Sequence, residues 1–428
     1  MRIARTAHPL LLGALLAVAA GRSAAYPIDA YAETGIERLE GYRLAQLGQV
    51  PGNRIPRGAQ LGLDEIRLRL LAQPDLQIPE PDARLTRRIL DLLGAEARDY
   101  SISVLDLSDP DAPLYGEHNG QVLRNPGSVG KLLVGLALFQ ALADLYPDDI
   151  EARKRVLRES QVVVDNFIHK EHHQVPFWLP EEKRLPRRRL REGDKANLWT
   201  FLDWMFSASS NGAATMVIKQ VMLLRHFGTG YPVAPERVAE FFRDTPRKDL
   251  GDMLIETLTS PVRRNGLDVE RLRQGSFFSH TAKRMVPGTS SVSTTRELIR
   301  YLLRLEQGRL VDNWSSLEIK RLMYMTQRRI RYAASPALDD AAVYFKSGSL
   351  YRCEPEEGFV CRKYEGNVLN LMNSVAIVES PAGAPRLFYM VAITSNVKKK
   401  NSAAEHQALA ARLHALLRDW RPAAAAAE

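Results

Sequence analysis

The sequence predicts an α/β (α+β) fold in which one antiparallel sheet, built from both chain ends and flanked by helices, lies beside an all-helical lobe. Three observations support this prediction. Two short β-rich runs stand near residue 100, three more follow residue 340, and the section between them is mostly helical to about residue 335. The predicted strands are residues 100–107, 114–119, 341–351, 373–380 and 386–395.

The first two predicted strands form a hairpin. Residues 100–107 read "YSISVLDL", which alternates in polarity, and "SDPDAP" (108–113) is a turn before the second strand. An amphipathic helix is expected just before them, at residues 83–97. Its apolar positions recur at helical spacing: Leu85, Ile89, Leu92 and Leu93.

The chain ends are expected to add an extension and a last helix. Residues 26–81 hold many Pro and Gly residues, with one helix expected at 35–47, and are interpreted as an extension wrapped on the main domain. The last helix covers 401–420, with Asn401 or Ser402 as its cap. The predicted parts are a signal peptide (1–25), the extension (26–81), a sheet lobe (82–120 and 340–420), a helical lobe (121–339) and a frayed tail (421–428).

The first 25 residues have the form of an export signal. Arg2 and Arg5 make a positive start, residues 10–20 form a short apolar core, and Ser-Ala-Ala at 23–25 fits the rule for cleavage after Ala25. The core is too short to span a bilayer, no cysteine there indicates a lipid anchor, and no later stretch is expected to be long and apolar enough to span. We expect a soluble bacterial protein that is periplasmic or secreted.

The net charge of +9 over 428 residues favours anionic surfaces. No zinc-finger or RNA-binding signature is present, so no nucleic-acid partner is expected. Two basic runs, at 183–191 and 396–401, have the composition of solvated surface, but such runs can also hold a protein near anionic envelope polymers. The only cysteines, Cys353 and Cys361, are expected to form a disulfide in an oxidising compartment.

The first candidate motif lies in "NPGSVGKLLVGLALF" (125–139), where a turn becomes an apolar helix. Ser128 and Lys131 stand three residues apart and therefore share a face. Burial and the positive helix end would lower the pKa of Lys131, so that its neutral amine could activate Ser128 as a nucleophile. The alternative is a serine cap with a solvated lysine. A second Ser-x-x-Lys match at 395–398 opens no apolar helix and is discarded.

The second motif is Ser209-Ser210-Asn211, between two amphipathic runs. Ser209 could relay a proton, and Asn211 could hold a substrate amide and orient Lys131. The alternative is an ordinary turn between helices, since Ser, Asn and Gly favour turns.

The third motif, Lys346-Ser347-Gly348, lies in the predicted strand 341–351. Lys346 would attract a substrate carboxylate, and Gly348 would allow close approach of an extended substrate. The N–H groups of Ser349 and Ser128 would together form an oxyanion hole. The alternative is an edge strand with a solubilising lysine and a bulge glycine.

In this order, the three motifs resemble those of penicillin-binding proteins and serine β-lactamases, nearest to class A β-lactamases, over about residues 82–420. The resemblance implies that Ser128 is acylated, with Lys131 as its base and Ser209 and Asn211 as the second element. In the third motif, Ser347 stands at the position where threonine is commoner in the family. It implies a serine hydrolase that acts on β-lactam or D-alanyl-D-alanine-like peptidoglycan amides, with other ester or amide substrates open.

The sequence departs from class A β-lactamases where a loop glutamate should activate the deacylating water. That loop is expected near 268–288, yet no Asp or Glu occurs from Arg271 to Arg296. The candidates left are Glu270, the more distant Asp268 and Glu256, and His280, whose alternative is a structural or surface role. The predicted consequence is slow deacylation. This points to a D,D-peptidase or penicillin-binding protein, or to a non-catalytic sensor or scaffold of the same fold.

One further cluster is "HKEHH", with His169, His172 and His173. Imidazoles are common metal ligands, but no second ligand cluster accompanies them, so no metal site is predicted. No cofactor is expected either. Insertions relative to a compact β-lactamase are expected near 150–195 and 225–270.

Overall fold

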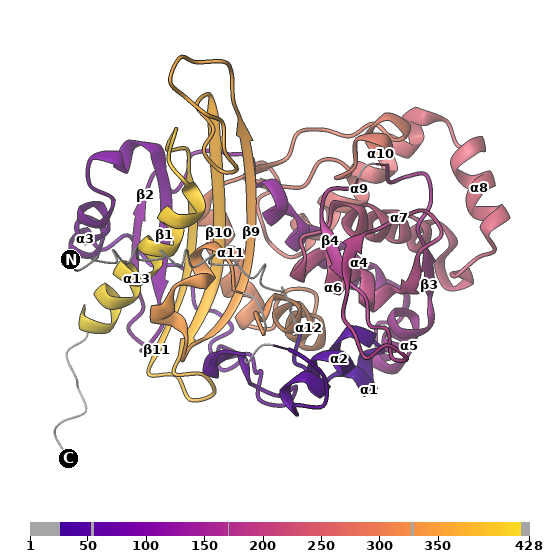
Figure 1. The fold of residues 1–428 in the computed structure, drawn as a ribbon, viewed down its shortest axis with the longest axis horizontal. Helices are drawn as coiled ribbons and strands as arrows, with labels where there is room; N and C mark the ends of the chain where they lie inside the picture. The colour runs from indigo at the N-terminus through magenta and orange to yellow at the C-terminus, as the bar shows by residue number, and fades with distance from the viewer. Residues whose placement is uncertain (1–25, 53–54, 170, 327–328, 421–428) are drawn as a thin grey trace, which may run out of the picture.

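The computed structural model describes residues 26–52, 55–169, 171–326 and 329–420. The predicted signal peptide (1–25) and the predicted tail (421–428) lie outside the described residues. Figure 1 shows a sheet with helices on its faces at one end of the molecule and a mainly helical lobe at the other.

The sheet has five antiparallel strands in the order β2-β1-β11-β10-β9, so both chain ends build it, as predicted. Within the sheet β1 pairs with β11, and Val104 lies opposite Val391. Strand β9 occupies one edge, and this edge faces the helical lobe (Figure 1). The strand bounds are β1 Tyr100–Asp106, β2 Leu114–His118, β9 Ala342–Arg352, β10 Leu369–Ser380 and β11 Leu387–Ser395.

Two helices cover one face of the sheet. Helix α3 (Ala83–Leu93) begins where the Asp82 side chain accepts a hydrogen bond from Leu85 N. It ends four residues earlier than predicted, because Gly94 adopts a left-handed φ of 58° and a 3-10 turn follows. Helix α13 (Ser402–Trp420) packs beside it. Asn401 Oδ1 accepts from the backbone N of Ala403 and Ala404, so Asn401 is the cap.

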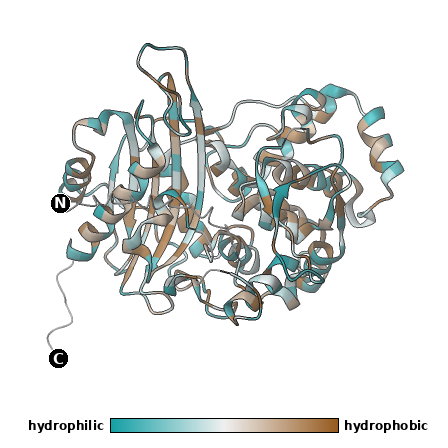
Figure 2. Cartoon of the chain, in the orientation of Figure 1, coloured by the Kyte–Doolittle hydropathy of each residue, from teal (hydrophilic) through white to brown (hydrophobic). Residues whose placement is uncertain are grey.

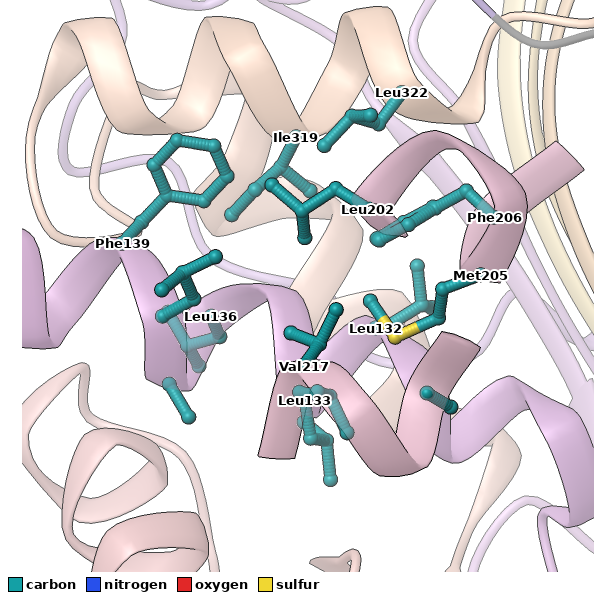
Figure 3. Close-up of a cluster of buried hydrophobic side chains, with 14 of the residues drawn as sticks. Leu132, Leu133, Leu136, Phe139, Leu202, Met205, Phe206, Val217, Ile319 and Leu322 are labelled. Carbon is teal, nitrogen blue, oxygen red and sulfur yellow. The ribbon is translucent and has the colours of Figure 1, made fainter. Parts of the chain in front are cut away.

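The helical lobe is organised around α4 (Lys131–Leu145), which is buried along most of its length because other helices surround it. Figure 3 shows the packing of its apolar side chains against three of those helices. The labelled side chains are Leu132, Leu133, Leu136 and Phe139 of α4, Leu202, Met205 and Phe206 of α6, Val217 of α7, and Ile319 and Leu322 of α12. The other helices of the lobe are α5 Ile150–Glu159, α6 Leu198–Ser207, α7 Asn211–Phe227, α8 Pro235–Asp244, α9 Arg247–Arg264, α10 His280–Met285 and α12 Asn313–Met323. Helix α11 (Thr295–Glu306), which was predicted to lie in the helical lobe, packs against β1 and β11 of the sheet instead.

The continuous helical segment Gly127–Leu145 is long and apolar enough, by length and composition, to cross a membrane. The expectation that no later stretch has that composition was therefore wrong. In the fold, 78% of its most apolar window is buried inside the protein. The apolar sequence reflects a core helix with protein on nearly every side. Figure 2 shows the corresponding contrast: inner elements are largely hydrophobic, and outer helices carry hydrophilic colour on part of their surface.

The helical lobe also contains short strands, so the prediction of an all-helical lobe was wrong in this respect. Three two-stranded sheets occur in the described residues, and two of them lie in the expected insertion near 150–195. Prolines 176, 180 and 186 interrupt that stretch and disfavour a continuous helix. The pairs are β3 Gln161–Val163 with β6 Lys195–Asn197, β4 Gln174–Pro176 with β5 Arg187–Arg189, and β7 Leu272–Arg273 with β8 Val292–Ser293.

The N-terminal extension contacts both lobes. It contains α1 (Tyr31–Thr34) and α2 (Glu37–Gln46), and it runs along the lower side of the molecule in Figure 1. Arg38 forms a buried ion pair with Asp203 of the helical lobe. Arg69 pairs with Glu379 at 2.7 Å in the sheet. These contacts fasten the two lobes to each other from one side.

The predicted disulfide joins Cys353 to Cys361, with a Cα–Cα distance of 6.1 Å. It lies in the loop between β9 and β10, which projects beyond the sheet in Figure 1. The bridge therefore closes a short loop that follows the third motif.

Candidate active site

Ser128 lies in a 3-10 turn, Gly127–Gly130, that leads directly into α4. Asn125 Oδ1 accepts a hydrogen bond from Gly127 N at 2.8 Å, and Gly127 adopts a φ of 53° that favours glycine. Ser128 is half-buried and makes no capping hydrogen bond to the helix. The alternative of a serine cap is therefore contradicted, and the hydroxyl is free for another partner.

That partner is Lys131, whose side chain is completely buried rather than solvated. Its Nζ lies 2.8 Å from Ser128 Oγ, 2.8 Å from Ser209 O and 2.7 Å from Asn211 Oδ1. The Phe278 ring lies 4.5 Å from the same nitrogen. A neutral amine can donate two hydrogen bonds to the two fixed oxygens, and its lone pair then faces the Ser128 hydroxyl.

Burial lowers the pKa of Lys131 to about 7. The negative charge of Glu171 opposes this shift, and the positive charge of Arg331 adds to it. Because an ordinary lysine has a pKa of about 10.5, a much larger fraction of this amine is neutral near pH 7. The arrangement can therefore transfer a proton from Ser128 at neutral pH.

The second motif forms the corner between α6 and α7. Ser210 caps α7 by accepting a hydrogen bond from Ala213 N at 3.0 Å. Ser209 precedes it with a φ of 56°, a left-handed value that costs a non-glycine residue roughly 1–3 kcal/mol. In this conformation its carbonyl oxygen accepts from Lys131 and its hydroxyl accepts from Lys346 Nζ at 2.9 Å. Ser209 thus lies between the two lysines.

Lys346, from the third motif, is buried on β9, and burial holds its pKa well below the usual lysine value. The charge of Lys131 lowers the pKa of Lys346 further. The alternative of a solubilising edge lysine is contradicted, because its Nζ points inward to Ser209 Oγ. Strand β9 is an edge strand, but its inner part packs against the turn that carries Ser128.

Gly348 allows this close packing. A Cβ at this position would lie 2.5 Å from Pro126 O and 2.6 Å from Ser128 N. A Cβ on Gly127 would in turn lie 3.4 Å from Ser349 N. The backbone nitrogens expected to form an oxyanion hole, those of Ser128 and Ser349, therefore lie on two segments in direct contact.

Four residues beside the three motifs were not predicted from the sequence to take part in this site. Arg331 donates to Ser347 Oγ at 2.8 Å and to Ser349 Oγ at 3.1 Å, so a guanidinium lies beside the third motif. It begins a 3-10 turn distant from the motif in sequence, and no local pattern marks it. Phe278, Glu171 and His173 are the others; the last two belong to the "HKEHH" stretch that was considered only for metal binding.

The carboxylates considered as deacylation bases pair with arginines instead. Glu270 forms an exposed pair with Arg273 at 3.2 Å, and Asp268 pairs with Arg271 at 3.2 Å. Glu256 pairs with Arg263 on α9. His280 is exposed and lines a cavity of about 410 Å³ that His169 and His172 also line. Within the described parts of the chain, no three or more His, Cys, Asp or Glu side chains are arranged to hold a metal ion.

A family model described as "Beta-lactamase enzyme family" matches residues 84–417. The structure is similar to the beta-lactamase from Sphaerobacter thermophilus DSM 20745, at 15% identity and a TM-score of 0.50, covering 78% of this chain and 98% of that one. It is also similar to a beta lactamase from Xanthomonas campestris pv. campestris str. ATCC 33913 (15%, TM-score 0.48, 78% and 97%). A third similar structure is PBP-A (13%, TM-score 0.46, 80% and 99%). At these identities the structural likeness concerns the fold. No curated protein matches the chain.

Proposed function

The chain belongs to the beta-lactamase enzyme family, and on that premise we propose that it is an exported serine acyl-transfer hydrolase. Its substrates would be β-lactams or D-alanyl-D-alanine-like amides of peptidoglycan type, and Ser128 would carry the acyl group. The observation that carries the proposal is the contact of 2.8 Å between Lys131 Nζ and Ser128 Oγ. A buried lysine with a lowered pKa is expected at a site of proton transfer.

In the proposed acylation step, neutral Lys131 accepts the proton of Ser128 while Ser128 Oγ bonds to the substrate carbonyl carbon. The backbone N–H groups of Ser128 and Ser349 would stabilise the oxyanion, which is the usual role of paired amide donors. The proton then passes from Lys131 through Ser209 to the leaving nitrogen. Lys346, 2.9 Å from Ser209 Oγ, supports this route because its Nζ donates a hydrogen bond to that oxygen, and a fixed donor stabilises a developing alkoxide.

A substrate carboxylate would bind beside the third motif. Arg331 brings a planar cation to the hydroxyls of Ser347 and Ser349, and Lys346 adds a nearby amine. An arginine suits a carboxylate because its donors match the two oxygens. Penicillins and peptides that end in D-alanine both carry such a group, which supports this substrate class.

A second candidate is a D,D-peptidase or penicillin-binding protein that deacylates slowly. The absence of Asp and Glu from Arg271 to Arg296 favours it, as does the apolar ring of Phe278 over Lys131. A non-catalytic scaffold is less consistent with the site. A buried amine costs free energy, and a protein that only binds would gain little from retaining it.

Export is part of the proposal. The basic and apolar pattern of residues 1–25 supports it, and so does the disulfide between Cys353 and Cys361, because disulfides persist in oxidising compartments. The division into an extension (26–81) and a catalytic domain (82–420) is likewise proposed. The basic run at 183–191 is proposed as a contact for anionic envelope polymers.

The test uses the mature chain and a fluorescent penicillin. A covalent adduct of the penicilloyl mass on a Ser128 peptide is the expected result, and Ser128→Ala should abolish labelling while circular dichroism stays unchanged. The matched control is Ser395→Ala, the serine of the discarded motif, which should label normally. Absence of an adduct on the folded wild type, or labelling of Ser128→Ala, would contradict the proposal. Release of penicilloate from penicillin would indicate a β-lactamase, and release of D-alanine from a D-alanyl-D-alanine peptide would indicate a D,D-peptidase.

A further inference from the structure

Glu171 connects the inserted segment between α5 and α6 to the second motif. Its side chain is buried, although it lies in a stretch of otherwise polar residues. Its Oε2 accepts a hydrogen bond from Ser210 Oγ at 3.2 Å and another from Gly212 N. Since Asn211 stands between those two residues and contacts Lys131, this carboxylate lies directly behind the catalytic corner.

The other oxygen of Glu171 binds the segment that contains it. Oε1 accepts from the backbone N of His172 at 2.8 Å, from the backbone N of His173 at 2.7 Å, and lies 2.8 Å from His173 Nδ1. Hydrogen bonds to His173 and Gly212 hold the pKa of Glu171 at about 2, against the effect of its burial. A carboxylate with this pKa is a weak base, so it suits holding an imidazole in place better than taking a proton itself.

His173 is connected to the catalytic corner through Glu171, whose carboxylate binds both His173 Nδ1 and Gly212 N. Burial is the main cause that lowers the pKa of His173, and the charges of Lys131 and Lys346 lower it further, while Glu171 opposes them. Its ring is therefore mostly neutral at pH 7. Because Nδ1 faces Glu171, the neutral ring carries its proton there and its Nε2 is the basic nitrogen. The His173 side chain is 35% exposed, so a water molecule can reach it.

We propose that His173, oriented by Glu171, is the general base that activates water for hydrolysis of the Ser128 acyl-enzyme. This inference rests on the proposed function. Nε2 accepts one proton of a water molecule while the water oxygen bonds to the ester carbonyl carbon. The tetrahedral intermediate then expels Ser128 Oγ, and the proton on the imidazolium passes through solvent to that oxygen. One ester and one water thus become a carboxylic acid and free Ser128.

The surrounding residues leave this role open to His173. The loop that should supply a carboxylate supplies Phe278 above Lys131, and a phenyl ring accepts no proton from water. Glu270 and Asp268, the nearest acidic residues in sequence, pair with arginines of their own segment. A carboxylate–imidazole pair is a common general base, because the carboxylate stabilises the imidazolium that forms.

The experiment compares His173→Gln with His172→Gln in the mature protein, using penicillin G and intact-mass measurement of the adduct over time. His172 is the adjacent, exposed imidazole, so it controls for loss of a histidine in this segment. We expect His173→Gln to be acylated at a rate within about threefold of wild type, and to release penicilloate about 100-fold more slowly, the size typical of a lost general base. His172→Gln should match wild type in both steps.

A pH profile distinguishes a base from a structural residue. Glu171, Lys131 and Lys346 are the groups whose charges act on the imidazole. In wild type, release should fall as the pH drops through the pKa of His173, since the imidazolium cannot accept a proton. The slower release that remains in His173→Gln should not decline in this way as the pH drops. Glu171→Gln should slow release as well, because the imidazolium loses its counter-charge.

The outcomes separate this inference from the proposed function. No adduct on folded wild type would overturn both. An adduct that His173→Gln releases at the wild-type rate would overturn the role of His173 and leave the acyl-enzyme intact. Equal losses in acylation and release would indicate that His173 only supports the structure, and would also overturn it. Slow release in His280→Gln with normal release in His173→Gln would assign the base to the loop histidine instead.

Discussion

Lys131 Nζ lies 2.7 Å from Asn211 Oδ1, although 80 residues of chain separate the two. The amide oxygen and Ser209 O occupy two hydrogen-bonding directions of the amine, and the remaining direction faces Ser128 Oγ. The second motif therefore acts on the first by orienting its base.

The rate of acylation should depend on pH through Lys131. Only the neutral amine accepts the proton of Ser128, and the pKa of Lys131 is lowered to about 7 by burial. The rate should therefore rise about tenfold per pH unit on the acid side of this value and level off above it. Stopped-flow labelling with a fluorescent penicillin measures the profile. Lys131→Arg, which stays protonated, should show no acylation at any of these pH values. A rate that does not change across the range would contradict the assignment of Lys131 as base.

Gly348→Ala should damage both the site and the fold. The added Cβ would meet Pro126 O at 2.5 Å and Ser128 N at 2.6 Å, both backbone atoms that have little room to move. Such overpacking typically costs about 1–3 kcal/mol of unfolding free energy. Urea denaturation measures this loss, and penicillin labelling of the folded variant should be strongly reduced. Gly230→Ala is the matched control, because nothing lies within 4 Å of its Cβ position. Full labelling of Gly348→Ala would show that β9 does not have to approach Ser128 so closely.

Arg331→Gln should weaken recognition of a substrate carboxylate. Arg331 lies against Ser347 Oγ and Ser349 Oγ, where the group would bind. Loss of a charge-assisted hydrogen bond of roughly 1.5–3 kcal/mol corresponds to about a 10–100-fold lower second-order acylation rate for penicillin G. The penicillin methyl ester lacks the negative charge, so its rate should change much less. If both compounds lose the same factor, Arg331 supports the fold of the site and does not read the carboxylate.

Asp203→Asn should destabilise the protein more than its single lost charge suggests. The change leaves the Arg38 guanidinium of the N-terminal extension buried without its ion-pair partner. Removing one member of a buried pair typically costs about 3–5 kcal/mol. Chemical denaturation monitored by tryptophan fluorescence gives the difference. Glu40→Gln breaks a partly exposed pair with Arg43 on the same helix and should change stability less. Equal effects of the two variants would argue against a fastening role for the extension.

The main elements of the fold were predictable because their signals are local. Alternating apolar residues at 100–107 and helical spacing from Leu85 to Leu93 each depend on neighbours within a few positions, and both elements formed as expected. The end of α3 was less predictable, because it depends on the backbone conformation of Gly94. The short strand pairs of the helical lobe were missed for a similar reason. A run of two or three residues is too short for its alternation of polarity to predict a strand.

The candidate site also has one part that could be predicted from the sequence and another part that only the folded structure creates. The chain order and residue types of the three motifs were sufficient to choose Ser128, Lys131, Ser209, Asn211 and the 346–349 stretch, because each motif is a few residues long. Whether Lys131 is buried, and which way its amine points, is set by Ser209 and Asn211 from another helix and by the ring of Phe278. Arg331 and the Glu171–His173 pair reach the site only through folding, so no spacing in the sequence marks them. Local interactions depend on neighbouring residues and can be read along the chain, whereas burial, charge and hydrogen-bond direction depend on segments that meet only once the chain has packed.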